Sequence, residues 1–206
     1  MFGVLEEQYS KPVGHIKLIQ HFGEPIVRPW HEIEPDCGIM DPRIGFLDLS
    51  NVEVLHTFED KNLIVNQASV LMAQRMAPGN LGTAGIGYLA VGTGVGTGTT
   101  AAPQPEDPTY KKLRIEAFRK AITSWTYLDA NGGVVATPPD GVGRIEFTTT
   151  FGPTEANYDL VEMGLFGGNA STTKDSGTMF NYKVFKVWSK TADLNASLTV
   201  VWTIAF

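Results

Sequence analysis

Residues 197–206 (SLTVVWTIAF) at the C-terminus decide the fold class of this chain. Large apolar side chains occur at every second position, and threonine, valine and alanine lie between them. This alternation predicts a β-strand with one buried face, because successive side chains of a strand point to opposite sides. A strand that ends on the last residue also predicts that this end is held inside a sheet. The predicted buried face comprises Leu198, Val200, Trp202, Ile204 and Phe206.

Further strand-like segments precede this one, at residues 86–91, 145–151, 160–166 and 180–185. Connections rich in Gly, Asn, Asp and Pro separate most of them, as is typical of turns between strands. The 22 glycines and 20 threonines disfavour a bundle of long helices, because both residues are poor helix formers. We therefore predict a mainly β, β-sandwich-like domain with one or two helices and an extended, proline-rich N-terminal arm.

The best helix signal lies in residues 60–77 (DKNLIVNQASVLMAQRMA), where apolar residues form a broad face at helical spacing. Asp60 or Asn62 could cap its start, and the Pro-Gly pair at 78–79 could end it. We expect a helix near residues 62–76 that packs on a sheet, within a β-rich domain of residues 59–206.

Two other segments invite functional readings. The Gly/Thr run at residues 92–105 (GTGVGTGTTAAPQP) matches neither phosphate-binding glycine pattern, so we interpret it as an exposed loop. Residues 109–122 (TYKKLRIEAFRKAI) carry five of the sixteen basic residues, and their apolar spacing permits either a short helix or a strand. Nearby acidic residues dilute this charge, so we expect a solvated face rather than a nucleic-acid patch.

The first 58 residues differ from the rest, because they contain about one proline per ten residues together with many apolar side chains. Proline removes backbone donors and makes the preceding residue extended, so no long helical period survives. We interpret residues 1–58 as an extended docking arm with short strands that packs on its own domain or on a neighbouring subunit. Its interface candidates are Ile16, Leu18, Ile19, Phe22 and Trp30.

Net charge and cysteine content exclude several classes of protein. The net charge of −6 gives no general attraction for nucleic acid. The single cysteine, Cys37, excludes an intrachain disulfide framework. The N-terminus lacks the pattern of a signal peptide, and no apolar run approaches the length of a membrane span. We expect a protein made in a reducing cytosol, without a nucleic-acid or membrane partner.

Catalytic and metal-binding patterns are weak. His31 with Glu32, Glu34, Asp36 and Cys37 is the densest polar cluster, but it matches no recognised ligand spacing. Neither a serine nucleophile motif nor a local signature around Cys37 is present. We therefore expect no catalytic residues, no metal site and no cofactor, and the protein is not predicted to be an enzyme.

The segment from Ile86 to the C-terminus resembles bacteriophage tail-fibre and tail-collar fibre modules. The resemblance rests on an apolar strand leading into a glycine loop (GYLAVGTGVG), on a Leu-x-x-Glu-x-x-Arg element, on an acidic residue before Gly-Leu-Phe, and on a closing Leu-Thr-Val strand. In this sequence the second and third elements are Leu113, Glu116 and Arg119, and Glu162 with residues 164–166. Such modules usually open a longer chain with a shaft and receptor-binding tip; because this sequence ends at Phe206, we expect no shaft.

The resemblance implies a β-rich, oligomeric virion protein, assembled in the host cytoplasm, whose partners are other virion proteins. We predict a structural protein of the tail, baseplate or collar, of the fibre-attachment type. It is expected to act as a homo-oligomer, either a trimer or a hexamer. The alternatives are a capsid decoration or cement protein, and a carbohydrate-binding β-sandwich module with tryptophans lining a groove.

Two further interface candidates lie in the Gly-Leu-Phe element. Leu165 and Phe166 are flanked by Gly164 and by the glycines at 167–168, which predicts a bend beside a strand. Because adjacent side chains of a strand point to opposite sides, we expect one of the two to face the core and the other to face a neighbouring subunit.

Overall fold

The computed structural model describes residues 13–29, 32, 44–76, 84–95 and 101–206. The strands are β1 (Val13–Phe22), β2 (Ile26–Pro29), β3 (Gly45–Asp48), β4 (Glu53–Ile64), β5 (Ala84–Gly92), β6 (Glu116–Ala121), β7 (Ser124–Leu128), β8 (Val134–Val135), β9 (Arg144–Phe151), β10 (Asp159–Gly168), β11 (Thr178–Ser189) and β12 (Ser197–Ala205). The helix α2 spans Gln67–Met76, and a 3₁₀ turn, η2, spans Ala192–Leu194.

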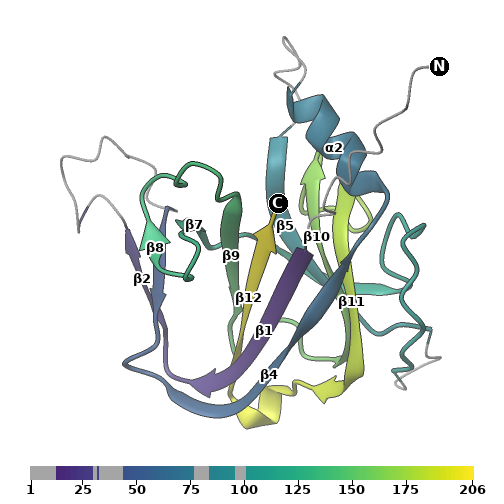
Figure 1. The fold of residues 1–206 in the computed structure, drawn as a ribbon. Coiled ribbons are helices and arrows are strands. Elements are labelled where there is room, and N and C mark those ends of the chain that lie inside the picture. The colour runs from purple at the N-terminus through teal and green to yellow at the C-terminus, as the bar shows by residue number, and fades with distance from the viewer. Residues whose placement is uncertain (1–12, 30–31, 33–43, 77–83, 96–100) are drawn as a thin grey trace, which may run out of the picture.

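Ten of the described strands form one antiparallel sheet in the order β6-β5-β10-β11-β4-β1-β12-β9-β7-β8. β4 joins its two halves, because residues 53–62 pair with β1 whereas Leu63 and Ile64 pair with β11. The halves turn toward each other about this junction, as Figure 1 shows, and enclose a core that draws side chains from both. The prediction of a mainly β, sandwich-like fold is confirmed.

The C-terminal strand lies deep in this arrangement. β12 pairs with β1 on one side and with β9 on the other, so its backbone is bonded along both edges. Leu198, Val200, Trp202 and Ile204 are fully buried, as the alternation predicts. Phe206 departs from the pattern: it follows the last paired residue, and its side chain is 55% exposed.

The N-terminal segment is not a separate arm over the part that the structure describes. β1 lies between β4 and β12, and Ile16, Leu18 and Ile19 are at most 2% exposed. The high density of proline misled the sequence interpretation, because residues 13–24 themselves contain none. Their apolar side chains belong to the core of their own domain. Among the described strands, β2 and β3 pair with each other and form a small separate sheet.

The helix begins later than its apolar spacing predicts. Residues 60–64 are the end of β4, and the helix begins at Gln67 rather than near residue 62. Neither Asp60 nor Asn62 caps it, since both lie in a strand. Strand pairing with β1 and β11 prevails over local helical periodicity, because burial against existing strands outweighs propensity. The proposed Pro-Gly stop at residues 78–79 lies outside the described residues.

The ambiguous segment at residues 109–122 contains a strand. β6 is the outermost strand of its half of the sheet and pairs with β5. The predicted strand at residues 86–91 is confirmed as the centre of β5. The Gly/Thr run that follows lies partly outside the described residues, at 96–100, and its described start remains close to the sheet through the bridge between Gly94 and Ala102.

Candidate functional site

Both faces of β10 are covered, which decides where Leu165 and Phe166 lie. Leu165 belongs to the main core, and Phe166 belongs to a second, smaller core with Leu113, Met179 and Tyr182. The two side chains therefore point to opposite sides, as predicted, but both are 0% exposed. The expectation that one of them faces a neighbouring subunit is wrong for this fold, because the segment before β6 supplies the second core.

Glu162 lies on the same face of β10 as Phe166 and is also fully buried. One carboxylate oxygen accepts hydrogen bonds from the backbone N–H of Gly94 (3.2 Å) and of Ile115 (3.0 Å). The other accepts from the backbone N–H of Arg114 (3.1 Å) and from the Tyr182 hydroxyl (2.6 Å). Four donors thus surround this carboxylate.

The surroundings of Glu162 explain two features of the nearby sequence. A Cβ atom on Gly92 would lie 2.5 Å from a Glu162 carboxylate oxygen, so only glycine leaves room for the carboxylate. Gly94 has a φ of +71°, a conformation that glycine adopts without steric cost. Burial and the hydrogen bond to Glu162 raise the pKa of Tyr182, so its hydroxyl remains a donor. Glu162 joins β5, β10, β11 and the segment before β6.

A second buried charge lies beside it. The Arg119 guanidinium donates to both carboxylate oxygens of Glu116 (2.6 and 2.7 Å), and both side chains are about 1% exposed. Arg119 also donates to the backbone carbonyls of Ser171 and Ser176, in the β10–β11 connection, and lies 4.8 Å from the centre of the Phe166 ring. The predicted solvated face is therefore wrong for Arg119, although Lys111 and Lys112 are exposed.

A β-bulge makes this ion pair possible. Residues three apart point to opposite faces of a regular strand, so Glu116 and Arg119 would not meet. In the β5–β6 ladder Val91 pairs with Phe118 while Gly92 pairs with Glu116, which leaves Ala117 as an extra residue. The bulge turns Glu116 onto the side of Arg119. The spacing of two charges in the Leu-x-x-Glu-x-x-Arg element thus has a structural reason that the sequence does not reveal.

Three of the four sequence motifs singled out above meet in this region. The glycine loop after β5, the Leu113–Glu116–Arg119 element and the Glu162–Phe166 element all surround the Glu162 carboxylate and the Phe166 ring. Only the closing strand lies elsewhere, in the middle of the other half of the sheet. We call this region the clamp, defined by Glu116, Arg119, Glu162, Phe166 and Tyr182.

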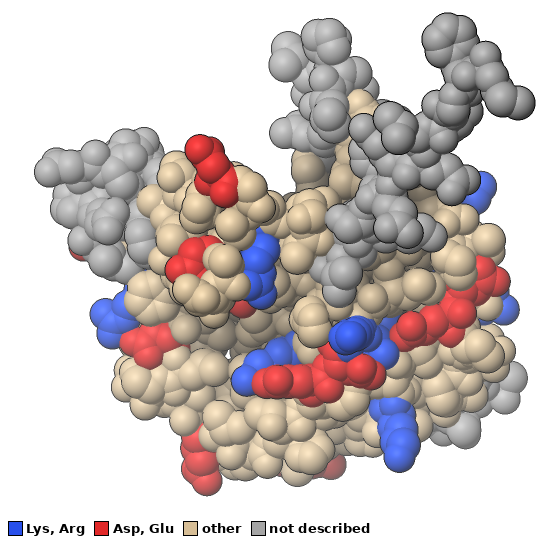
Figure 2. Space-filling view, in the orientation of Figure 1, with Lys and Arg blue, Asp and Glu red and all other residues tan. Residues whose placement is uncertain are grey.

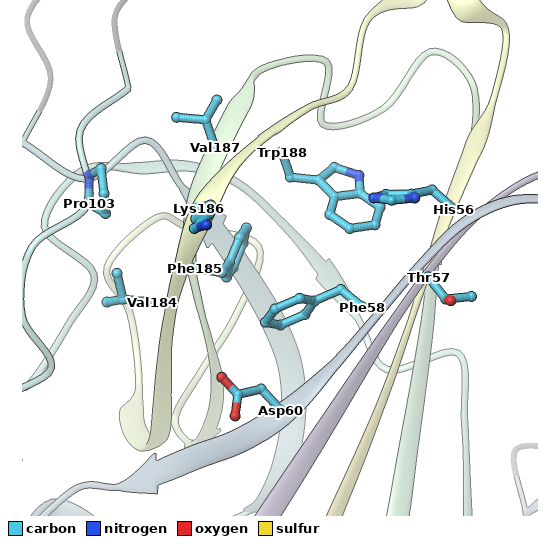
Figure 3. A pocket seen from close by; sticks show the side chains of 10 residues that line it. All are labelled: His56, Thr57, Phe58, Asp60, Pro103, Val184, Phe185, Lys186, Val187 and Trp188. Atoms are coloured by element: carbon cyan, nitrogen blue, oxygen red, sulfur yellow. The ribbon is translucent and has the colours of Figure 1, made fainter.

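A cavity of the described fold lies between β4 and β11. These strands pair only at Leu63–Tyr182 and Ile64–Asn181, and beyond that point they diverge. The space between them is about 790 Å³ and is lined by His56, Thr57, Phe58, Asp60, Pro103 and residues 184–188. Figure 3 shows the side chains of Phe58, Phe185 and Trp188 between the two strands. We call this region the seam.

A second bulge accompanies the divergence. In the β10–β11 ladder Glu162 pairs with Val184 and Leu160 pairs with Trp188, so residues 185–187 of β11 lie opposite Val161 alone. Extra residues bend a strand and increase its twist, which turns this end of β11 away from β4. Sequence patterning could not locate the seam, because alternation describes the faces of a strand and not the partners at its edges.

The charged side chains near the seam are of both signs. Lys183 lies 2.8 Å from Asp60 and 3.2 Å from Glu106, and Lys17 on β1 pairs with Glu59. Figure 2 shows acidic and basic side chains mixed over this side of the molecule, without a broad patch of one sign.

The remaining predicted site residues are dispersed. Phe22 ends β1 and is 36% exposed, whereas Trp30 lies outside the described residues, as does most of the polar cluster around His31. Within the described ranges, no group of three or more His, Cys, Asp or Glu side chains is arranged to hold a metal ion. The helix found in those ranges falls short of the length and apolarity that a membrane crossing requires.

Comparison with models of protein families, with curated proteins and with solved structures found no match to this chain.

Proposed function

We propose that this chain is a structural subunit of a phage virion, placed at the tail, baseplate or collar, that acts by oligomeric assembly with other virion proteins. The observation that carries the proposal is the clamp. Three separate sequence elements of the tail-fibre resemblance form one buried unit around Glu162, so the resembling residues have a common structural purpose.

The chemistry of the buried charges supports a structural role. The Glu162 carboxylate already accepts four hydrogen bonds, and the Arg119 guanidinium is engaged by Glu116 and by two backbone carbonyls. Lys190 is 1% exposed and donates to the carbonyls of Gly152 and Glu155 and to the side chain of Asn157. The hydrogen bonds of each of these groups hold a loop onto a strand. This is expected of a subunit that needs a rigid fold for assembly.

Labelling of particles tests this function. Gold-tagged antibodies against the purified chain, applied to phage particles from cells that carry its gene, should bind at one end of the particle. Label spread over the shell would favour a capsid decoration protein instead. Particles without label, from a preparation whose lysate contains the chain, would contradict a virion role.

A further inference from the structure

The seam is bounded by strand edges rather than by strand faces. Five consecutive residues of β11, 184–188, line it, together with His56, Thr57 and Phe58 of β4. One edge of β4 pairs with β1 and one edge of β11 pairs with β10, so the edges that the two strands turn toward each other have no strand partner among the described residues beyond Leu63 and Tyr182. Backbone donors and acceptors of two strands therefore face the same space.

Pairing along these two edges is incomplete among the described residues. β4 and β11 share two residue pairs, and the other edge of each strand is already used, by β1 and by β10. At the narrow end the backbone N–H of Val184 donates to the Glu106 carboxylate (2.9 Å), where a neighbouring strand would otherwise offer a carbonyl. Apolar side chains are exposed beside the edges: Val54 (49%), Leu55 (42%) and Val187 (50%).

An extended polypeptide fits this space better than a sugar does. Two strand edges offer backbone groups that a third extended chain can bond, which is the basis of strand addition. A sugar site needs an open aromatic face, but the Trp188 ring lies 4.8 Å from the His56 ring, centre to centre, at an angle of 37°. Figure 3 shows His56 lying against Trp188, so the His56 ring covers part of the indole face.

We propose that the seam binds residues 1–12 of a second copy of this chain as an added strand. Twelve residues precede β1, and at about 3.3 Å per residue they reach roughly 40 Å when extended, more than the stretch of β4 that lines the seam. In its own copy the segment leaves β1, and β4 stands between β1 and the seam. A neighbouring copy is therefore the natural donor.

The sequence of the segment matches the chemistry of the seam. Phe2, Val4 and Leu5 are apolar, as are the Phe58, Phe185 and Val187 side chains that they would meet. Glu6 and Glu7 follow, and successive side chains alternate, so one carboxylate faces the outer side of the added strand. There Lys186 is exposed and pairs with no acidic group of the described residues. This proposal rests on the oligomeric part of the proposed function and not on a place in a virion.

A charge exchange in the full-length chain tests the proposal, with the association constant measured by sedimentation velocity over a range of concentrations. Lys186→Glu, and separately Glu6→Lys with Glu7→Lys, should each weaken association about fivefold to tenfold, as loss and reversal of a partly exposed charge pair would. The combined variant should associate within about threefold of the original chain. Lys174→Glu, an exposed lysine in the β10–β11 connection, is the matched control and should change nothing.

A synthetic peptide of residues 1–12 gives a second test that needs no variant. Added in excess, it should compete for the seam and shift the oligomer toward smaller species, whereas a peptide of the same composition in scrambled order should not. Unchanged association in the reversal variants, or failure of the combined variant to recover, would overturn the seam as the docking site while leaving assembly intact. A chain that is monomeric at every concentration would overturn both this proposal and oligomeric assembly. Binding of a sugar that is lost in Trp188→Ala, without any competition by the peptide, would overturn it in favour of a glycan site.

Discussion

The clamp and the seam share β11, which supplies Tyr182 to the clamp and residues 184–188 to the seam, but their polar groups are satisfied in opposite ways. At the clamp, loops cover the outer face of β10, and each buried charge is met by backbone groups or by an opposite charge. At the seam, β11 bends away from β4, and aromatic side chains and strand edges meet open space. Both regions contain a β-bulge. The bulge in β6 brings Glu116 to Arg119, whereas the bulge in β11 accompanies the end of its pairing with β4.

This difference indicates that the clamp stabilises the fold and that the seam is open to a partner. A buried carboxylate with several donors is costly to disturb, since any lost partner leaves a buried polar group without a bond. An exposed strand edge costs little to alter but offers bonds to another chain. Substitutions at the clamp should therefore change unfolding, and substitutions at the seam should change association.

The largest effects are expected from Leu165→Ala and Phe166→Ala. Both side chains are fully buried, in different cores, so each loss should leave a cavity and lower the free energy of unfolding by about 3–5 kcal/mol. Denaturant titration with matched slopes would measure both values. A change below about 1 kcal/mol in either variant would show that one face of β10 is open, as the sequence alone suggested.

Arg119→Met should cost about 3 kcal/mol or more, because it leaves the Glu116 carboxylate buried without its partner. The double variant Glu116→Met with Arg119→Met removes both charges and should recover much of this loss, since apolar pairs often replace buried ion pairs well. Comparison of the single and double variants by urea unfolding measures the coupling. A double variant as unstable as the single one would show that the contacts of Arg119 with the serine carbonyls matter more than the ion pair.

Glu162→Gln should lower the free energy of unfolding by about 2–3 kcal/mol. The amide keeps the shape of the side chain but turns an NH₂ group toward donors, which leaves backbone N–H groups of the clamp unbonded. Tyr182→Phe removes a single donor and is the matched control, with a smaller expected loss. Equal losses in the two variants would indicate that only the tyrosine contact stabilises the fold.

Buried His21 predicts a pH dependence. Burial lowers its pKa below the ordinary value near 6.5, so the unfolded chain binds a proton that the folded chain does not. Stability should therefore fall as the pH decreases through 6.5, by at most about 1.4 kcal/mol per pH unit. Urea midpoints between pH 7.5 and 5 should fall more steeply in the original chain than in His21→Gln.

The smallest effect on folding is expected at the seam. Val187→Thr removes apolar surface from a side chain that is already half exposed, so unfolding should change by no more than about 0.5 kcal/mol. Association should nevertheless weaken if a neighbouring chain packs there. Thermal unfolding and sedimentation of the same sample separate the two effects. A clear loss of thermal stability with unaltered association would show that Val187 belongs to the core. The distinction between a clamp that governs unfolding and a seam that governs association would then be wrong.

Strand content was readable from the sequence because alternation is a local property. The buried face of β12 from Leu198 to Ile204 and the centre of β5 follow directly from their residues. The helix start, the position of residues 13–22 and the burial of Arg119 were not readable in this way. In each case a segment distant in the sequence supplied the missing contact: β11 for residues 63–64, β12 for β1, and the β10–β11 connection for Arg119.

The sequence by itself determined that this chain forms a mainly β domain and that its C-terminal end is held in a sheet, since both follow from the period of its apolar residues. Only the tertiary structure decided that Phe166 and Glu162 are buried and that β4 and β11 diverge after two residue pairs. The physical reason is that periodicity specifies which side chains share a face, whereas coverage of that face and pairing of an edge depend on elements that arrive from elsewhere in the chain.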